Sequence, residues 1–64
     1  MSIINYYNYL CTLPHWKEEA ATLGWLIAYA KTEADLLELT KTTVKLIADF
    51  KLPEPPAEVY KNGI

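Results

Sequence analysis

The uncharged run from Ala20 to Ala30, AATLGWLIAYA, constrains the fold more than any other stretch of this sequence. As a helix it is about 17 Å long, whereas a helix that crosses a bilayer needs about 20 apolar residues. We therefore expect a buried helix rather than a transmembrane helix. Apolar side chains occupy more than one side of this helix, so a single neighbouring helix is not expected to cover all of them.

The chain has 64 residues, which is near the lower size limit for a domain that folds without further support. Domains this small usually depend on disulfides, a metal ion or oligomerisation. Cys11 is the only cysteine, which excludes an internal disulfide and a cysteine-based zinc site. The composition, 52% hydrophobic with a net charge of −2, is that of a globular protein. We expect one folded domain over residues 1–64, stabilised by association with another chain.

The first ten residues, MSIINYYNYL, lack the basic start and the long aliphatic run of a secretory signal. A single cysteine also fits a reducing compartment, so we expect a cytoplasmic protein. The chain carries six basic residues, all of them lysine, against eight acidic ones. Because phosphate groups are usually bound by basic, arginine-containing patches, this charge balance argues against a nucleic-acid partner.

The segment 1–13 has two possible interpretations. Its tyrosines and isoleucines favour a strand by propensity, but the spacing of its apolar residues favours a helix. These residues recur at intervals of three and four: Ile3, Tyr6, Tyr7, Leu10 and Leu13. Ser2 can cap the first turn, and no second strand pattern is present for pairing. We predict a short helix, with a strand as the alternative.

Two longer helices are predicted over residues 14–31 and 33–51, so the central unit spans 14–51. Pro14 suits a first helical turn, and Glu18 and Lys31 have the charge signs that favour the two ends of one helix. The connection between the helices is very short, which makes them antiparallel neighbours in an αα-hairpin. Thr32 to Asp35 resembles a capping box, with Asp35 in place of the usual Glu or Gln.

Each long helix has an apolar stripe that is expected to face the other helix. In the first helix the stripe consists of Trp16, Ala20, Leu23, Ile27 and Ala30. In the second it consists of Leu36, Thr40, Thr43, Ile47 and Phe50. Gly24 lowers the helix propensity of the first helix, and a close approach by another helix would explain its presence.

Residues 52–64 form a proline-rich tail, because the prolines at positions 53, 55 and 56 prevent the second helix from continuing. We expect an extended or polyproline II segment. Its apolar residues Leu52, Val59 and Tyr60 would allow it to return along the helices and cover Trp16 or Tyr7. A loose tail is the alternative.

No pattern in the sequence indicates catalysis. His15 could share a helical face with Glu18 and Glu19, but a metal site needs three or four ligands held by a further shell of hydrogen bonds. Cys11 precedes His15 by four residues, but Pro14 interrupts the helix between them, so a nucleophile–base pair is not expected. Paired carboxylates in an apolar pocket and a glycine-rich phosphate loop are also lacking. We predict no enzyme activity, no metal and no cofactor.

The candidate interface consists of apolar residues that fall outside the contact predicted between the two long helices. These are Trp25, Leu26, Tyr29, Leu37 and Val44, together with Tyr7. Aromatic side chains suit a surface that is wet when free and dry when bound, and contiguous apolar patches usually mark binding sites. We expect this face to bind a second copy, in a homodimer or larger helical bundle, or a larger protein partner.

The sequence thus predicts a small all-α protein that acts by binding another protein, as an adaptor or inhibitor does. Small helical proteins of this type are frequent among the accessory proteins of bacteriophages and mobile elements. Peripheral membrane association through Trp25 and Tyr29 is the alternative, although few lysines surround that face. A cysteine-based redox or metal-binding protein is a weaker alternative.

Overall fold

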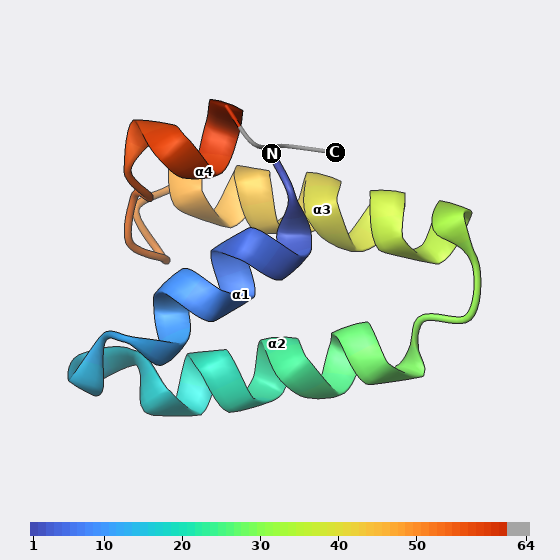
Figure 1. Ribbon diagram of the computed structural model, residues 1–64, viewed down its shortest axis with the longest axis horizontal. Helices are drawn as coiled ribbons and strands as arrows, with labels where there is room; N and C mark the ends of the chain where they lie inside the picture. The colour runs from blue at the N-terminus through green and yellow to red at the C-terminus, as the bar shows by residue number, and fades with distance from the viewer. Residues whose placement is uncertain (62–64) are drawn as a thin grey trace.

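The computed structural model describes residues 1–61, and all regular elements in this range are helical. They are helix α1 (Ile3–Cys11), the 3-10 turn η1 (Pro14–Trp16), and helices α2 (Lys17–Tyr29), α3 (Glu33–Ala48) and α4 (Ala57–Lys61). The all-α prediction is therefore confirmed, and the N-terminal segment is a helix rather than a strand. Helices α2 and α3 run in opposite directions, and α1 crosses between them (Figure 1).

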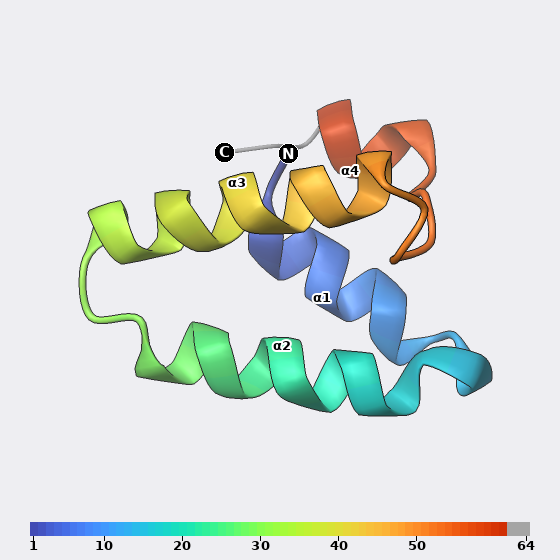
Figure 2. The ribbon, with the colours of Figure 1, turned by 180° about the vertical axis from the view of Figure 1, so that it is seen from behind.

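Helix α1 is the centre of the molecule. Its first turn is capped as predicted, since the Ser2 hydroxyl accepts a hydrogen bond from the Asn5 N–H at 3.3 Å. Its buried residues are Ile3, Tyr6 and Leu10. It packs on both α2 and α3, and α2 packs more extensively on α1 than on α3. Seen from the opposite side, α1 again lies between the two long helices (Figure 2). The apolar stripe of α2 therefore packs largely on α1, whereas α3 packs on both α1 and α2.

Helix α2 is shorter at both ends than the predicted helix over 14–31. The α-helix begins at Lys17, after η1, because the backbone of Trp16 leaves the helical region with φ −117° and ψ 26°. It ends at Tyr29, and the next residue is extended. Lys31 consequently lies in the connection to α3 and not in the last turn of α2, where its charge was expected.

The start of α3 is capped by Thr32, as predicted. The Thr32 hydroxyl accepts a hydrogen bond from the Asp35 N–H at 3.1 Å. The reciprocal bond differs from that of a capping box, because the Asp35 carboxylate accepts from the Lys31 N–H at 3.2 Å and not from the capping residue. This second bond ties the connection to the first turn of α3.

Helix α3 ends at Ala48, and the predicted end near residue 51 is wrong because Phe50 adopts the left-handed conformation, with φ 60°. The Phe50 N–H donates to the Ile47 carbonyl at 3.1 Å. The following Lys51 N–H donates to the Leu46 carbonyl at 2.9 Å, which completes a Schellman motif. The prediction that Phe50 belongs to the inner stripe is also wrong, since its side chain is 94% exposed.

The C-terminal tail packs on the core. The Tyr6 hydroxyl donates to the Pro53 carbonyl at 2.7 Å, and Pro55 and Val59 are buried. The packed alternative is thus confirmed within the described residues, although the direct hydrogen bond is to Tyr6 rather than to Trp16 or Tyr7. The expectation of an extended tail is wrong for α4, because no proline follows Pro56 and Ala57 can start a helix. The Tyr60 side chain lies outside the described part of the structure.

The core is small and is built from four helices. Its buried apolar residues are Ile3, Tyr6, Leu10, Ala20, Leu23, Ile47 and Val59. Thr43 is the buried polar residue of α3, and its hydroxyl donates to the Leu39 carbonyl at 2.9 Å, so it leaves no unsatisfied group. Because α1 covers one side of α2 and α3, the remaining apolar positions of these helices face solvent.

Candidate functional site

Large apolar side chains are exposed at seven of the described positions: Ile4, Trp25, Leu26, Tyr29, Leu37, Val44 and Phe50. Five of these belong to the interface predicted from the sequence, and they are between 42% and 66% exposed. The sixth predicted residue, Tyr7, is half-buried against the core. Ile4 and Phe50 were not predicted to be exposed apolar residues.

The helical period places the predicted interface residues on two flanks rather than on one face. On α2, Gly24, Trp25 and Ala28 lie on one side of the buried stripe that contains Leu23. Leu26 lies on the other side of that stripe, with Glu19 about two turns before it. Each flank lines a groove of its own.

The first groove lies between α1 and α2 and has a volume of about 670 Å³. It is lined by Ile4, Tyr7, Asn8, Ala21, Gly24, Trp25, Ile27 and Ala28. None of these residues carries a charge, and we call this site the uncharged groove. A Cβ atom on Gly24 would lie 2.9 Å from Cε1 of Tyr7, so the glycine allows the Tyr7 ring to rest directly on α2.

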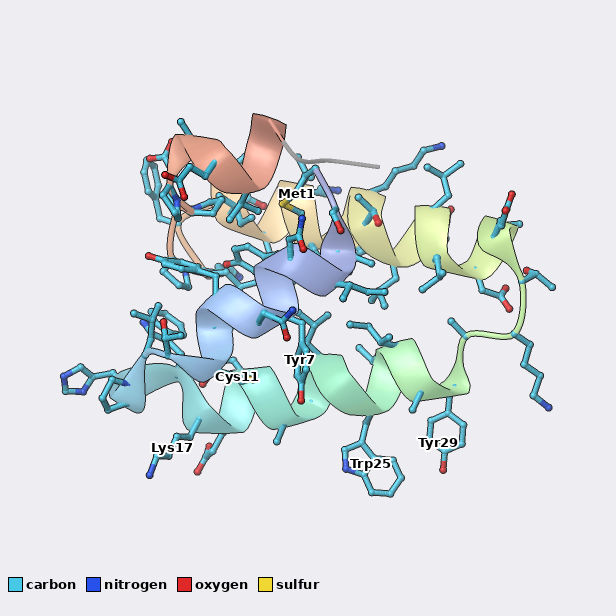
Figure 3. All side chains as sticks on the ribbon, in the orientation of Figure 1. Met1, Tyr7, Cys11, Lys17, Trp25 and Tyr29 are labelled. Carbon is cyan, nitrogen blue, oxygen red and sulfur yellow. The ribbon has the colours of Figure 1, made fainter. Side chains whose placement is uncertain are left out.

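Two of the predicted aromatic residues form a pair on the outer side of α2. The rings of Trp25 and Tyr29 are stacked, with centroids 5.6 Å apart and planes inclined by 30°. Both side chains point away from the rest of the molecule, whereas Tyr7 points from α1 toward α2 (Figure 3). The pair therefore presents an exposed aromatic surface beside the uncharged groove.

Ile4 extends the apolar surface toward α3. It lines both the uncharged groove and a second hollow of about 460 Å³, which also contains Leu37. Val44 lies two turns after Leu37 on the same side of α3. Ile4 therefore connects the hollow lined by Tyr7 and Trp25 to the one lined by Leu37.

The second groove lies between α2 and α3. It consists of two hollows, of about 300 Å³ and 420 Å³, that share Leu26, Leu39 and Thr42. Its leucines are Leu10, Leu23, Leu26, Leu39, Leu46 and Leu52, and Tyr29 lines the end near the connection. Its carboxylates are Glu18, Glu19, Asp35 and Glu38, and no lysine of the described chain lines it. We call this site the acidic groove.

The two candidate chemical residues, Cys11 and His15, lie on different elements, α1 and η1. The Cys11 thiol is exposed. The pKa of the Tyr7 phenol is raised from its ordinary value, first by a side-chain hydrogen bond with Cys11, then by charge repulsion from Cys11 and least by burial of the phenol. His15 is exposed in η1, after the break that ends α1. Within residues 1–61, no three side chains of His, Cys, Asp and Glu gather as ligands for a metal ion. The helices of the same range are too short or too polar to cross a membrane.

The sequence contained a signal for the acidic groove, although only part of it could be interpreted. One polar stripe of the second long helix indicates a solvent-facing side; it contains Asp35, Glu38, Thr42, Lys45 and Asp49, of which the first three line the groove. Glu18 and Glu19 fit the favourable position of negative charge at the start of α2. That the two sets border the same leucines follows only from the packing of α2 against α3.

Comparisons of this chain with protein-family models, with curated proteins and with solved structures found no match.

Proposed function

We propose that this protein acts without catalysis, as an adaptor or inhibitor that binds other protein chains through exposed apolar surfaces. The observation that supports this proposal is the exposure of seven large apolar side chains on a chain of 64 residues. Five of the seven line the hollows described above, namely Ile4, Trp25, Leu26, Tyr29 and Leu37, and clustered exposed apolar side chains are characteristic of binding sites. The proposal places the protein in the reducing cytoplasm, where the exposed Cys11 thiol stays unpaired.

The uncharged groove is the proposed site of homodimer formation. A second copy can approach it without opposing like charges, because its lining carries none. In a two-fold dimer each copy presents the same patch to the other, so the protruding Trp25 of each copy would occupy the groove of its partner. The hairpin of α2 and α3 in each copy would then form part of a larger helical bundle.

Sedimentation velocity at micromolar concentration tests this assembly. We expect a dimer for the unmodified protein and a monomer for Trp25→Glu, since the new charge would be buried at the interface. Ala34→Glu is the matched control: it adds the same charge at an exposed position that lines neither groove, and it should leave the dimer intact. A well-folded monomer for the unmodified chain would overturn the proposed dimer.

A binding function also predicts that the two chemical residues are dispensable. Replacement of Cys11 and His15 by Ala should leave partner capture from the native host unchanged, because both side chains are exposed and line neither groove. Trp25→Glu serves as the positive control in the same pull-down. If Cys11→Ala or His15→Ala alone abolished the biological activity while binding was retained, the non-catalytic proposal would fail.

A further inference from the structure

We propose that the acidic groove binds an amphipathic helix of a foreign protein, with an apolar stripe flanked by lysine or arginine. This inference rests on the proposed binding function and adds the chemistry of the partner. It concerns the flank of α2 opposite the uncharged groove. The two sites adjoin where Trp25 stacks on Tyr29, which lines one end of the acidic groove, and matched variants distinguish them.

The dimensions of the acidic groove fit a short helix. On α2 it runs from Glu18 to Tyr29, and on α3 from Asp35 to Leu46. Each stretch is about 17 Å long, which corresponds to about three helical turns. A groove between two antiparallel helices with leucines along its floor is a common receptor for an apolar helical stripe, whose anchors recur at i, i+3 or i+4 and i+7.

The charges around the acidic groove select the kind of helix. Glu18 and Glu19 border it on α2, and Asp35 and Glu38 border it on α3. Because the two helices are antiparallel, one pair of carboxylates lies at each end of the groove, on opposite edges. A bound helix would therefore have carboxylates near both of its ends, where basic side chains complement them. Exposed ion pairs contribute little stability each, but together they favour a basic partner over an acidic one and accelerate its association.

A second copy of this chain is a poorer occupant. A two-fold contact through the acidic groove would bring two sets of four carboxylates together in a protein whose net charge is already −2. The most basic apolar edge of the chain itself contains Leu37, Lys41 and Val44 on α3. Insertion of that edge into the groove of a neighbour would be a head-to-tail contact, which produces open chains or rings rather than a two-fold dimer.

Designed peptides test the inference directly. The probe is a fluorescent helical peptide of about 14 residues, long enough for the three turns of the groove, with leucines at the anchor positions and lysines on both flanks. A second peptide has glutamate in place of every lysine. In fluorescence anisotropy we expect saturable binding of the lysine peptide, weakened by added salt, and no binding of the glutamate peptide.

Two pairs of matched variants locate the binding site. Leu26→Gln alters the acidic groove and Trp25→Gln alters the uncharged groove at the neighbouring exposed position. The triple variant Glu18→Gln, Glu19→Gln, Glu38→Gln removes three charges from the groove. The control Asp49→Asn, Glu54→Gln, Glu58→Gln removes three exposed charges elsewhere. We expect the first member of each pair to weaken binding of the lysine peptide by about tenfold or more. The charge control should leave binding unchanged, and Trp25→Gln should weaken it much less than Leu26→Gln, because Trp25 reaches the groove only through its stack with Tyr29. Circular dichroism checks that each variant is folded.

The inference is overturned if the glutamate peptide binds as tightly as the lysine peptide, or if Trp25→Gln weakens binding as much as Leu26→Gln. It is also overturned if the protein forms open chains that Leu26→Gln dissolves, because the occupant would then be a second copy. Failure of both peptides, with a dimer that Trp25→Glu dissociates, would remove this inference and leave the proposed function standing. If the protein binds the lysine peptide but is monomeric at every concentration, the proposed dimer would be removed and this inference would stand.

Discussion

At the scale of single residues, Phe50 is held in a conformation that its side chain disfavours. It occupies the left-handed position after α3, which glycine usually fills, and its ring is 94% exposed. The left-handed conformation costs a residue with a Cβ atom roughly 1–2 kcal/mol. The ring returns no packing energy in the free protein, so the stability of the fold does not explain a phenylalanine here. Binding to another molecule would explain it.

Phe50→Gly should therefore stabilise the protein. The substitution removes the free-energy cost of the left-handed conformation, and this gain is larger than the entropic cost of ordering a glycine on folding. We therefore expect the free energy of unfolding to rise by about 0.5–1 kcal/mol. Urea denaturation followed by circular dichroism measures this change. Phe50→Ala keeps the strain and should shift the midpoint much less. Loss of stability in Phe50→Gly would show that the ring contributes to the fold.

The close contact between Gly24 and the Tyr7 ring explains why position 24 of α2 is a glycine. In a helix interior, alanine is favoured over glycine by about 1 kcal/mol, but a Cβ at position 24 would lie 2.9 Å from Cε1 of Tyr7. We expect Gly24→Ala to gain little or to destabilise the protein, because the ring must shift. The same substitution in a Tyr7→Ala background should recover about 1 kcal/mol. Urea denaturation of the four proteins in this cycle gives the coupling; equal effects in both backgrounds would contradict the contact.

At the scale of elements, the hydrogen bond from Tyr6 to the Pro53 carbonyl connects the central helix to the tail. Tyr6→Phe keeps the buried ring and removes the donor, which leaves the carbonyl without this partner. We expect a loss of about 1 kcal/mol in the free energy of unfolding, together with greater proteolytic sensitivity of the tail. Tyr9→Phe is a suitable control, because Tyr9 packs against the same core and contacts the Tyr6 ring. An equal loss in both variants would assign the effect to the rings and not to the bond.

The elements were predictable where their signals are local. Ser2 and Thr32 cap helices because a hydroxyl needs only a free N–H three residues later. The early end of α3 and the existence of α4 were not predicted, because the first depends on the left-handed Phe50 and the second follows a proline-rich stretch typical of extended chain. The insertion of α1 between the long helices could not be predicted from periodicity, which shows which side of a helix is apolar but not which neighbour covers it.

The candidate site was predictable to the same extent. The exposure of Trp25, Leu26 and Tyr29 follows from the period of α2 alone, once Leu23 and Ile27 are assigned to the buried stripe. Their division between two grooves does not follow from the period, because it depends on the packing of α1 on one side of α2 and of α3 on the other side of α2. The sequence therefore identified exposed apolar residues of α2, and the tertiary packing assigned them to separate surfaces.

At the scale of the whole molecule, charge separates the two grooves. Four of the eight acidic residues border the acidic groove, and none lines the uncharged groove. A surface without charge is compatible with its own copy, whereas a surface with one sign of charge requires a partner of the opposite sign. One small core can thus support self-association on one side and recognition of a foreign helix on the other.

This separation predicts two independent effects on thermal stability, because any ligand that binds only the folded chain stabilises it. The unfolding midpoint of the unmodified protein should rise with protein concentration through the dimer. The lysine peptide should raise this midpoint further. At a peptide concentration 100 times Kd, binding adds about 2.7 kcal/mol to the free energy of unfolding. Differential scanning fluorimetry of two variants separates the effects. Trp25→Glu should lose the concentration dependence and keep the response to the peptide, whereas Leu26→Gln should do the reverse. Loss of both effects in either variant would mean that the grooves are one site, since residues on separate surfaces should not abolish each other's binding.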